Sequence, residues 1–458
     1  MTASAAPRMA NPQPPGASGG SVRGAVESTA GAGRFGEWYA VCLLSIATFL
    51  SYLDRGAIAV LVTGIKQEMG LTDVQIGLLQ GISFSAFFAL AGVPLGLMAD
   101  RLNRRNLIAA GISLWSAATF LCGYAETFLQ LLLARMAVGV GEAALIPAAG
   151  SLIASLFQPE KRGKPMSAIV AAQSFGAAGA SLLGGMLLLL LSGRGPIDLP
   201  FFPDAAHWRV VLVLFGIPGP LVAMLMLMMR EPPRPPVSAR ECGILEFVSR
   251  RPLLFVGLYL SFAMNFIIAY SQALWSPTVL SRSYGFSPGN AGVVFGSVMI
   301  FASVSGSTLG GILGDALAKR NVAMARHGIS LATTPLAMVG GVLMICATNA
   351  TMYLSGFACG AFAAGVLIGA SYPILYEIVP PSLRGRAAAI YMIVGNVIGL
   401  GGGPLAVGLL MNSVYQDTGH AGTAVGAVVL SAALTGCALL VATRNAYRRA
   451  IDAVAPAV

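Results

Sequence analysis

Four charged side chains lie inside long apolar stretches of this sequence, and they are Asp54, Arg55, Arg135 and Glu142. A charge within a membrane-spanning helix costs at least about 2.5–3.5 kcal/mol on insertion scales, so such groups are expected to face a cavity and to pair. Arg135 and Glu142 lie two helical turns apart and share a face, whereas adjacent Asp54 and Arg55 point about 100° apart. Two acids and two bases make a neutral set, which predicts a buried charge cluster between two helices.

The expected chemistry of this cluster is the uptake and release of protons. Burial disfavours the ionised form of a carboxyl group and a neighbouring guanidinium favours it, so separating the two changes the affinity for a proton. We predict that Asp54 takes up a proton when it separates from Arg135 or Arg55, and releases the proton when the pair reforms. The competing interpretation is a static ion-pair lock between the two helices.

Polar side chains of the second half are the candidates for the rest of a substrate cavity. This half carries no comparable charge inside its apolar stretches, and Glu377 lies at the end of one of them. The candidates, with one tyrosine of the first half, are Tyr52, Asn265, Tyr270, Gln272, Ser371, Tyr372 and Asn396. A hydrogen bond between packed helices is the competing interpretation for each one. Together they favour a division of labour, in which the first half handles the proton and an anionic headgroup and the second half an apolar body.

These residues belong to segments long enough to cross a membrane. The 458 residues are 56% apolar and 10% charged, with a mean hydropathy of +0.77, whereas soluble domains carry about 25% charged residues. Stretches of about 20 apolar residues predict membrane-spanning helices. Twelve are found, at roughly 38–61, 75–99, 106–124, 128–156, 165–191, 209–229, 253–281, 289–313, 328–347, 351–378, 386–411 and 422–443. Their length and Gly/Ala content exclude barrel strands and predict an all-α integral membrane protein.

The basic residues predict the orientation of the chain. Most of the 28 Lys and Arg residues fall in the N-terminal tail, the even-numbered loops, the stretch 230–251 and the C-terminal tail. This is the positive-inside pattern, and it places both termini in the cytoplasm. The net charge of +10 is therefore expected to act on topology and on anionic lipid headgroups, and not on nucleic acid.

Two loops occur twice. The stretch Gly-Leu-Met-Ala-Asp-Arg-Leu-Asn-Arg-Arg at 96–105 is echoed by Gly-Ile-Leu-Gly-Asp-Ala-Leu-Ala-Lys-Arg at 311–320. Pro-Glu-Lys-Arg-Gly-Lys at 159–164 and Pro-Ser-Leu-Arg-Gly-Arg at 381–386 form a second pair, each just before an apolar segment. Two parallel six-helix repeats with a site between them are therefore predicted.

The prolines of 230–251 forbid a continuous helix and divide the halves. The expected organisation is a disordered cytoplasmic tail at 1–33, a first bundle at 34–229, a linker with a short amphipathic helix at 230–251, a second bundle at 252–445 and a cytoplasmic tail at 446–458.

Other functional classes receive little support from the sequence. Six scattered cysteines and three separate histidines form no ligand cluster, so neither a metal nor a cofactor is predicted. Neither a Ser/His/Asp set nor a phosphate-binding loop is present, which speaks against an enzyme. A passive lipid scramblase or channel is the alternative of another class, although pores more often carry rings of one charge sign.

The motifs resemble those of a known transporter superfamily. Gly96, Asp100, Arg101, Arg104 and Arg105 resemble the loop 2–3 signature of the major facilitator superfamily, with Asn103 where Gly is usual. The stretch from Arg135 through Glu142 to Pro147 resembles its helix 4 motif. More narrowly, Tyr-Leu-Asp-Arg at 52–55, Gly-Val-Gly-Glu-Ala at 139–143 and Arg-Glu-Pro-Pro-Arg at 230–234 resemble the Spinster family.

The resemblance implies a fold and roles for particular residues. The fold would be twelve transmembrane helices in two pseudo-symmetric six-helix bundles. Asp54, Arg55 and Glu142 would be central to coupling or headgroup binding, with Arg135 beside them. A cytoplasmic gate would be formed by Gly96, Asp100, Arg101, Arg104, Arg105, Asp315, Arg384 and Arg386. In it, Asp100 would meet the start of helix 11 near Arg384 and Arg386, and Asp315 the start of helix 5 near Arg162.

The predicted function is secondary active transport by alternating access, coupled to protons, with an amphipathic lysolipid or sphingoid-like substrate. A multidrug exporter or an organic-anion/proton symporter of the same superfamily is the alternative. The expected partners are the lipid bilayer, the substrate and protons. A monomer in a bacterial inner membrane is expected, since the Ala-rich, Arg-over-Lys composition is typical of a bacterial chain.

Overall fold

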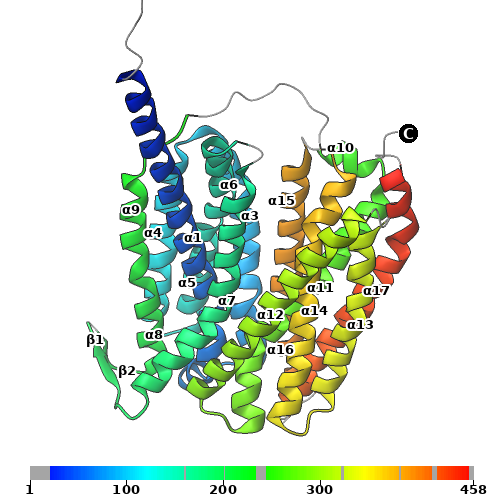
Figure 1. Ribbon diagram of the computed structural model, residues 1–458. Helices are drawn as coiled ribbons and strands as arrows, with labels where there is room; N and C mark the ends of the chain where they lie inside the picture. Colours follow the sequence, from blue (N-terminus) through cyan, green and yellow to red (C-terminus); the bar gives the residue numbers. More distant parts are fainter. Residues whose placement is uncertain are drawn as a thin grey trace, which may run out of the picture.

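The protein consists of helices arranged in two bundles, in a computed structural model that describes residues 21–158, 161–200, 202–233, 244–320, 324–380, 383–414 and 420–452 (Figure 1). The first bundle contains α1 (Ser21–Met69), α2 (Asp73–Gln80), α3 (Ile82–Arg101), α4 (Arg104–Cys122), α5 (Phe128–Glu142), α6 (Leu145–Leu156), α7 (Gly163–Leu191), α8 (His207–Gly216) and α9 (Pro218–Met228). The second contains α10 (Ile244–Ser249), α11 (Pro252–Tyr284), α12 (Pro288–Lys319), α13 (Ala325–Ile345), α14 (Ala350–Ile378), α15 (Arg384–Val394), the π-helical η3 (Gly395–Gly402), α16 (Gly403–Ser413) and α17 (Ala421–Asp452). The predicted all-α membrane fold is confirmed.

The helices follow the predicted apolar segments, several of which are divided. In the described residues, 11 helical stretches are long and apolar enough to cross a membrane, and α4 is not among them. Its 19 residues begin with Arg-Arg-Asn, which shortens the apolar part. The segment predicted at 75–99 divides at Gly81 into α2 and α3, and the one predicted at 386–411 contains η3. Each division lets one membrane segment bend.

The two ends of the molecule are distinguished by small elements. A two-stranded antiparallel hairpin, β1 (Ile197–Leu199) and β2 (Phe202–Ala205), lies between α7 and α8, and the helical pattern did not predict it. We call this end the hairpin side. The opposite end, where α10 and the chain termini lie, is called the linker side (Figure 1). Ile244, Phe247 and Val248 of α10 pack on the buried core of the second bundle.

The start of α1 differs from the expected extent of the N-terminal tail. The helix begins at Ser21, so residues 21–33 are helical where composition predicted disorder. A helix grows outward from an existing one without a new nucleus, which favours this extension of the packed part of α1. Residues 1–20 and 453–458, and 234–243 of the linker, lie outside the described residues.

Asn103, where the superfamily loop usually has glycine, has a capping function. Its side chain accepts a hydrogen bond from the backbone N–H of Asn106 at 2.9 Å and so caps the start of α4. Asparagine is among the strongest N-cap residues. The departure from the motif therefore helps to start the next helix.

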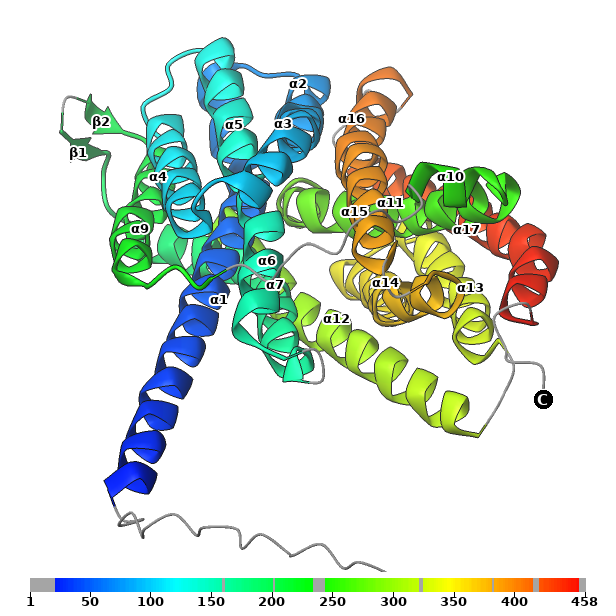
Figure 2. The ribbon, with the colours of Figure 1, turned by 90° about the horizontal axis from the view of Figure 1, so that it is seen from above.

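Glycines allow the two bundles to meet on the hairpin side. A Cβ atom placed on Gly185 of α7 would lie 2.6 Å from the carbonyl oxygen of Gly289 of α12, and one on Gly292 would lie 2.7 Å from that of Ser181. On the other flank, a Cβ on Gly77 of α2 would lie 2.9 Å from the Pro404 carbonyl oxygen. Backbone contact at two places thus joins the halves, which lie side by side when seen from the linker side (Figure 2).

Candidate functional site

A buried ion pair joins α1 to α5. The Nε atom of Arg55 donates to Oε2 of Glu142 at 2.7 Å, and the Ser51 hydroxyl donates to the same oxygen at 2.6 Å. Arg55 is 5% exposed and Glu142 1% exposed. Ser51 and Arg55 are one turn apart on α1, so both reach one carboxylate. The predicted charge cluster therefore has a specific core, which is Arg55 with Glu142.

Aromatic rings surround the Arg55 guanidinium. Its central carbon lies 4.5 Å from the ring centroid of Tyr52, 4.7 Å from that of Phe84 and 4.8 Å from that of Phe88. Phe84 and Phe88 come from α3, one turn apart, and their rings stack. Cation–π contacts of this kind become stronger as water is excluded. The Arg55 guanidinium is therefore held by the Glu142 carboxylate on one side and by the three aromatic rings on other sides.

Asp54 points away from this pair, as the angle between neighbouring helical residues requires. Its Oδ2 accepts a hydrogen bond from the Thr119 hydroxyl of α4 at 3.2 Å. Arg135 donates from Nη1 to the backbone carbonyl of Asp54, also at 3.2 Å. The side-chain ion pair expected between Asp54 and an arginine is therefore replaced by a contact through the main chain. The adjacent Arg55 forms its ion pair with Glu142 instead.

Each of the four predicted charges retains a buried polar atom without a hydrogen-bond partner. These atoms are Oδ1 of Asp54, Nη1 of Arg55, Nε of Arg135 and Oε1 of Glu142. A buried charged group that lacks a partner costs more than a neutral one, and such groups are uncommon in folded proteins. The cluster therefore contains charged groups whose hydrogen-bonding capacity is only partly used among the described residues.

The second half contributes an aromatic surface that faces this cluster. Tyr270 of α11 lies within electrostatic range of Arg55 and Tyr52, and Tyr372 of α14 lies within that range of Tyr52. Three of the predicted cavity residues, Tyr52, Tyr270 and Tyr372, thus come together from opposite halves.

Two aromatic residues that sequence reasoning missed extend this surface. Tyr391 of α15 lies 4.9 Å from Tyr372 and 5.4 Å from Phe266 between ring centroids, and Phe266 lies 5.9 Å from Tyr270. The spacing of Phe262, Phe266 and Tyr270 by four residues was the available signal, because it places them on one face of a helix.

The other predicted cavity residues make contacts inside the second bundle. The side-chain amide of Asn265 donates to the Ala364 carbonyl at 3.3 Å, that of Gln272 to Met344 Sδ at 3.5 Å, and that of Asn396 to the Met392 carbonyl at 2.8 Å. The hydroxyl of Ser371 donates to the Leu367 carbonyl. These are contacts of helix packing or of a single helix. A place for these residues in a substrate cavity stays a prediction.

The predicted gate residues of the first half divide into two groups. Asp100 and Arg101 are exposed at the end of α3. Arg104 is 0% exposed, and its guanidinium bonds Glu231 at 2.7 Å, the Ser155 hydroxyl at 2.6 Å and the Pro232 carbonyl at 2.7 Å. Arg104 therefore joins α4, α6 and the start of the linker within its own half, where the sequence placed it in a gate.

Arg105 and Gly96 also make contacts inside the first bundle. Arg105 donates from Nη1 to the Met229 carbonyl at 2.9 Å, and its backbone N–H donates to Glu231. A Cβ on Gly96 of α3 would lie 4.0 Å from Pro147 of α6. The first bundle thus uses these loop residues to hold its own helices and the beginning of the linker.

The predicted gate residue Asp315 of the second half also makes its contacts within its own half. Asp315 pairs with Arg326 at 2.8 Å, and Arg326 also pairs with Glu377 of α14, which receives a hydrogen bond from Tyr447 of α17. Asp315 is therefore bound within its own half, where the resemblance implied a contact with the start of helix 5.

The second repeated loop has equivalent contacts in the two halves. Arg384 donates to the Tyr376 carbonyl at 2.9 Å at the end of α14, and Arg162 donates to the Ala154 carbonyl at 2.7 Å near the end of α6. Each arginine precedes or begins the next helix and binds the last turn of the previous one, where a cation is favoured. Arg386 is exposed. The duplicated sequence thus has a duplicated structural role.

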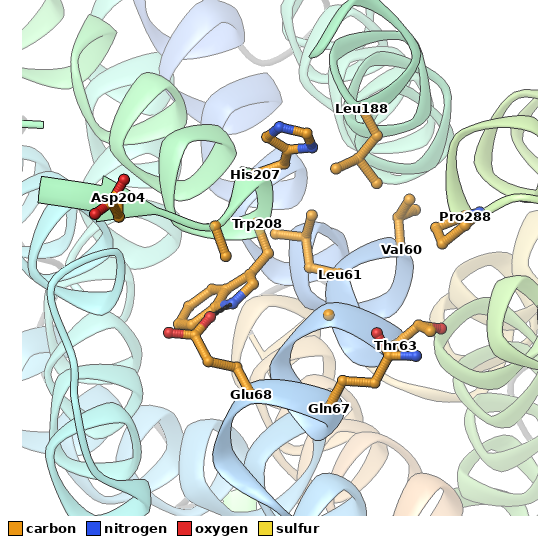
Figure 3. A pocket seen from close by; sticks show the side chains of 12 residues that line it. Val60, Leu61, Thr63, Gln67, Glu68, Leu188, Asp204, His207, Trp208 and Pro288 are labelled. Atoms are coloured by element: carbon orange, nitrogen blue, oxygen red, sulfur yellow. Dashed lines mark hydrogen bonds between the residues drawn. The ribbon is translucent and has the colours of Figure 1, made fainter. Parts of the chain in front are cut away.

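A separate cavity of about 620 Å³ opens on the hairpin side (Figure 3). Its lining comes from the end of α1, from α7, from β2, from the start of α8 and from Pro288 at the start of α12. Two acids, Glu68 and Asp204, line it, and Glu68 is bound by Arg209 at 2.7 Å and by the Trp208 ring N–H at 2.5 Å. The charge cluster of Arg55 and Glu142 does not line this cavity.

Comparisons with known proteins agree with this arrangement. Residues 44–404 match the profile of the Major Facilitator Superfamily. An MFS-type efflux pump of Mycolicibacterium smegmatis is 30% identical over 434 residues, covering 90% of this chain and 94% of that protein. Protein spinster homolog 1 of Homo sapiens is 28% identical over 414 residues, covering 82% of this chain and 73% of that protein.

A solved structure has the same architecture. The crystal structure of a bacterial homolog of the human lysosomal transporter Spinster, in an inward-facing and unoccupied conformation, has a TM-score of 0.71 and 26% identity. The match covers 92% of this chain and 99% of the chain in that crystal structure. The chain belongs to the Major Facilitator Superfamily, and its resemblance to Spinster proteins is confirmed. It is a multi-pass membrane transporter and not an enzyme.

Proposed function

We propose that this transporter couples the movement of protons to that of an amphipathic substrate with an anionic head, of the lysolipid or sphingoid type, across or out of the membrane. The observation that carries the proposal is the buried Arg55–Glu142 ion pair. Aromatic rings surround the guanidinium, and Tyr270 of the opposite half lies near it. Intramembrane charge is functional by default, because its insertion cost must be offset by a role.

The proton step is assigned to the carboxylates of the cluster. Glu142 is ionised while Arg55 is bound to it, and it binds a proton when Arg55 turns to a substrate anion, because a buried carboxylate without its cation is unstable. Asp54, with Oδ1 unpartnered, is the second carboxylate that can take a proton. Substrate and proton would thus bind together, the substrate anion at Arg55 and the proton at Glu142, each replacing one partner of the ion pair.

The substrate class follows from the chemistry of the two surfaces. The free Nη1 of Arg55 is a donor for a phosphate or carboxylate oxygen, for which guanidinium geometry is well suited. The aromatic surface of Phe266, Tyr270, Tyr372 and Tyr391 is suited to an apolar body. The name of the Mycolicibacterium smegmatis relative, an MFS-type efflux pump, supports a role in small-molecule transport.

The placement in the membrane is part of the proposal. The positive-inside pattern supports a cytoplasmic linker side, with both termini there and the hairpin side outside. The predicted location is a bacterial inner membrane, and the predicted state is a monomer.

The test uses purified protein in liposomes with an internal pH dye and an imposed proton gradient. Lysophospholipids, sphingoid phosphates, cationic drugs and small organic acids are added one at a time. We expect substrate-dependent proton flux for an anionic amphiphile, and its loss in Glu142→Gln and in Asp54→Asn with folded protein retained. Glu377→Gln is the matched control, since it also removes a carboxylate paired with an arginine, but at the linker end of α14.

Other outcomes separate the alternatives. Flux driven by cationic drugs alone would favour a multidrug exporter, for which the 30% identical efflux pump is the supporting observation. Flux with small organic acids would favour a symporter of organic anions. Movement of lipid without proton flux, unchanged in Glu142→Gln, would reject coupling and indicate a passive scramblase.

A further inference from the structure

Three charged side chains meet on the hairpin side, where the two halves are in contact. The Asp73 carboxylate accepts hydrogen bonds from Lys66 Nζ at 2.7 Å and from Arg282 Nη1 at 2.8 Å. Lys66 on α1 belongs to the same half as Asp73, whereas Arg282 on α11 belongs to the opposite half. The side chains of Asp73 and Arg282 are 15% and 11% exposed. One carboxylate is therefore shared between a cation of its own half and a cation from across the interface.

Asp73 is fixed in the first half independently of Arg282. It is the first residue of α2, directly after Thr72, whose side chain forms a capping box with Gln75. An acid in the first turn is stabilised by the helix N-terminus, and Lys66 adds a full positive charge. If Arg282 moves away, Lys66 and the N-terminus of α2 still compensate the negative charge of Asp73.

Arg282 and other polar side chains of α11 and α2 lack some of their hydrogen-bond partners. Its Nη2 atom is buried without a hydrogen-bond partner, as are Oγ1 of Thr278, one turn deeper on α11, and Oε1 of Gln80 on α2. The Gln80 amide donates to the Leu274 carbonyl at 3.0 Å, which crosses the same interface. Unpartnered buried polar atoms destabilise the closed contact, and water would satisfy them if the halves separated. A specific attraction is therefore needed to keep this contact closed.

We propose that the Asp73–Arg282 ion pair is the latch of a gate on the hairpin side, and that Lys66 retains the charge balance of Asp73 when the latch opens. The inference rests on the alternating access of the proposed function, and on no property of the substrate. Opening breaks the Asp73–Arg282 ion pair and keeps the Asp73–Lys66 pair. It also exposes the polar atoms of Gln80, Thr278 and Arg282 to water. The glycine contacts of α7 with α12 and of α2 with α16 fit such a surface, because backbone contact without interlocking side chains separates cleanly.

The test measures opening of the gate without substrate or gradient. Thr278→Cys is introduced after the native cysteines are replaced by alanine, and its modification by a membrane-impermeant maleimide added on the hairpin side is timed. We expect Arg282→Gln to raise the modification rate about fivefold, the effect of losing one partly buried ion pair. Lys66→Gln is the matched control, because it removes the other cation of the same carboxylate without crossing the interface. It leaves Asp73 uncompensated when the latch opens, so it should not raise the rate.

The outcomes are decisive in both directions. Equal acceleration by Lys66→Gln and Arg282→Gln would assign the triad to general charge balance and reject the latch, as would no acceleration by either. If Arg282→Gln does not fold, Arg282→Lys and Asp73→Asn test the same pair: Arg282→Lys keeps the charge and should hold the parent rate, whereas Asp73→Asn should accelerate modification. Loss of proton coupling in the liposome assay with the latch effect intact would reject the proposed driving ion and leave the gate standing.

Discussion

At the residue scale, the site depends on two neighbours on α1 that face different partners. Arg55 binds Glu142 of α5, and Asp54 lies against Thr119 of α4 with Arg135 on its carbonyl. One turn of rotation per 3.6 residues makes this division unavoidable. The consequence is that the two acids have different hydrogen-bond partners, Thr119 for Asp54 and Arg55 with Ser51 for Glu142.

Arg135 is predicted to be needed for stability. Arg135→Ala removes a buried cation that donates to the Asp54 carbonyl and lies near two buried acids, and leaving that buried carbonyl without this donor costs about 1–3 kcal/mol. We expect a clear fall in the thermal unfolding temperature of the detergent-solubilised protein. Arg386→Ala, at an exposed position, is the control and should unfold with the parent. Unchanged stability and transport in Arg135→Ala would show that the four charges do not act as one cluster.

At the scale of elements, the interruptions in the helices determine where the halves can approach. Gly81 separates α2 from α3, and a Cβ there would lie 2.8 Å from the carbonyl oxygen of Gly401 in η3. Two irregular points in two membrane segments thus face each other across the interface. Irregular helix geometry is frequent at functional sites, where it allows segments to bend.

The packing of η3 against α11 gives a prediction with an internal control. A Cβ on Gly399 would lie 2.2 Å from the Cβ of Phe266, whereas nothing lies within 4 Å of one on Gly402. Gly399→Ala should therefore destabilise the protein by about 1–3 kcal/mol through overpacking. Gly402→Ala, in the same segment, should be neutral or stabilising by about 0.4–1 kcal/mol. Thermal unfolding of the two variants checks this, and equal effects would contradict the close packing around Phe266.

At the scale of the whole molecule, the halves are joined on the hairpin side by glycine contacts and by the Asp73–Arg282 pair. On the linker side, the repeated loops instead hold each half together internally, through Arg104 with Glu231 and through Arg326 with Asp315 and Glu377. Each half can therefore move as a rigid unit. The closing contact on the linker side is assigned by proposal to Asp100 and the start of α15.

This assignment predicts an effect opposite to that of the hairpin-side latch. Asp100→Asn should favour the state that is open on the linker side, because it weakens the contact that closes that side. The Thr278→Cys modification rate from the hairpin side should then fall, by about fivefold for the loss of about 1 kcal/mol. Asp452→Asn, exposed on the same side, is the control. A rate unchanged by Asp100→Asn would remove Asp100 from the gate.

Composition and spacing along the chain were enough to predict the membrane-spanning segments, the duplication and the four buried charges. These follow from local composition and spacing, since hydrophobic length and charge cost act within a single segment. The pairing of the charges, by contrast, depends on how the helices pack in three dimensions. Arg55 binds Glu142 and not Asp54, Arg104 binds Glu231, and Asp73 meets Arg282, because each contact depends on the rotation and tilt of helices distant in the chain. A periodic pattern shows that a helix has an inner face, but it does not specify which residue of another helix lies opposite.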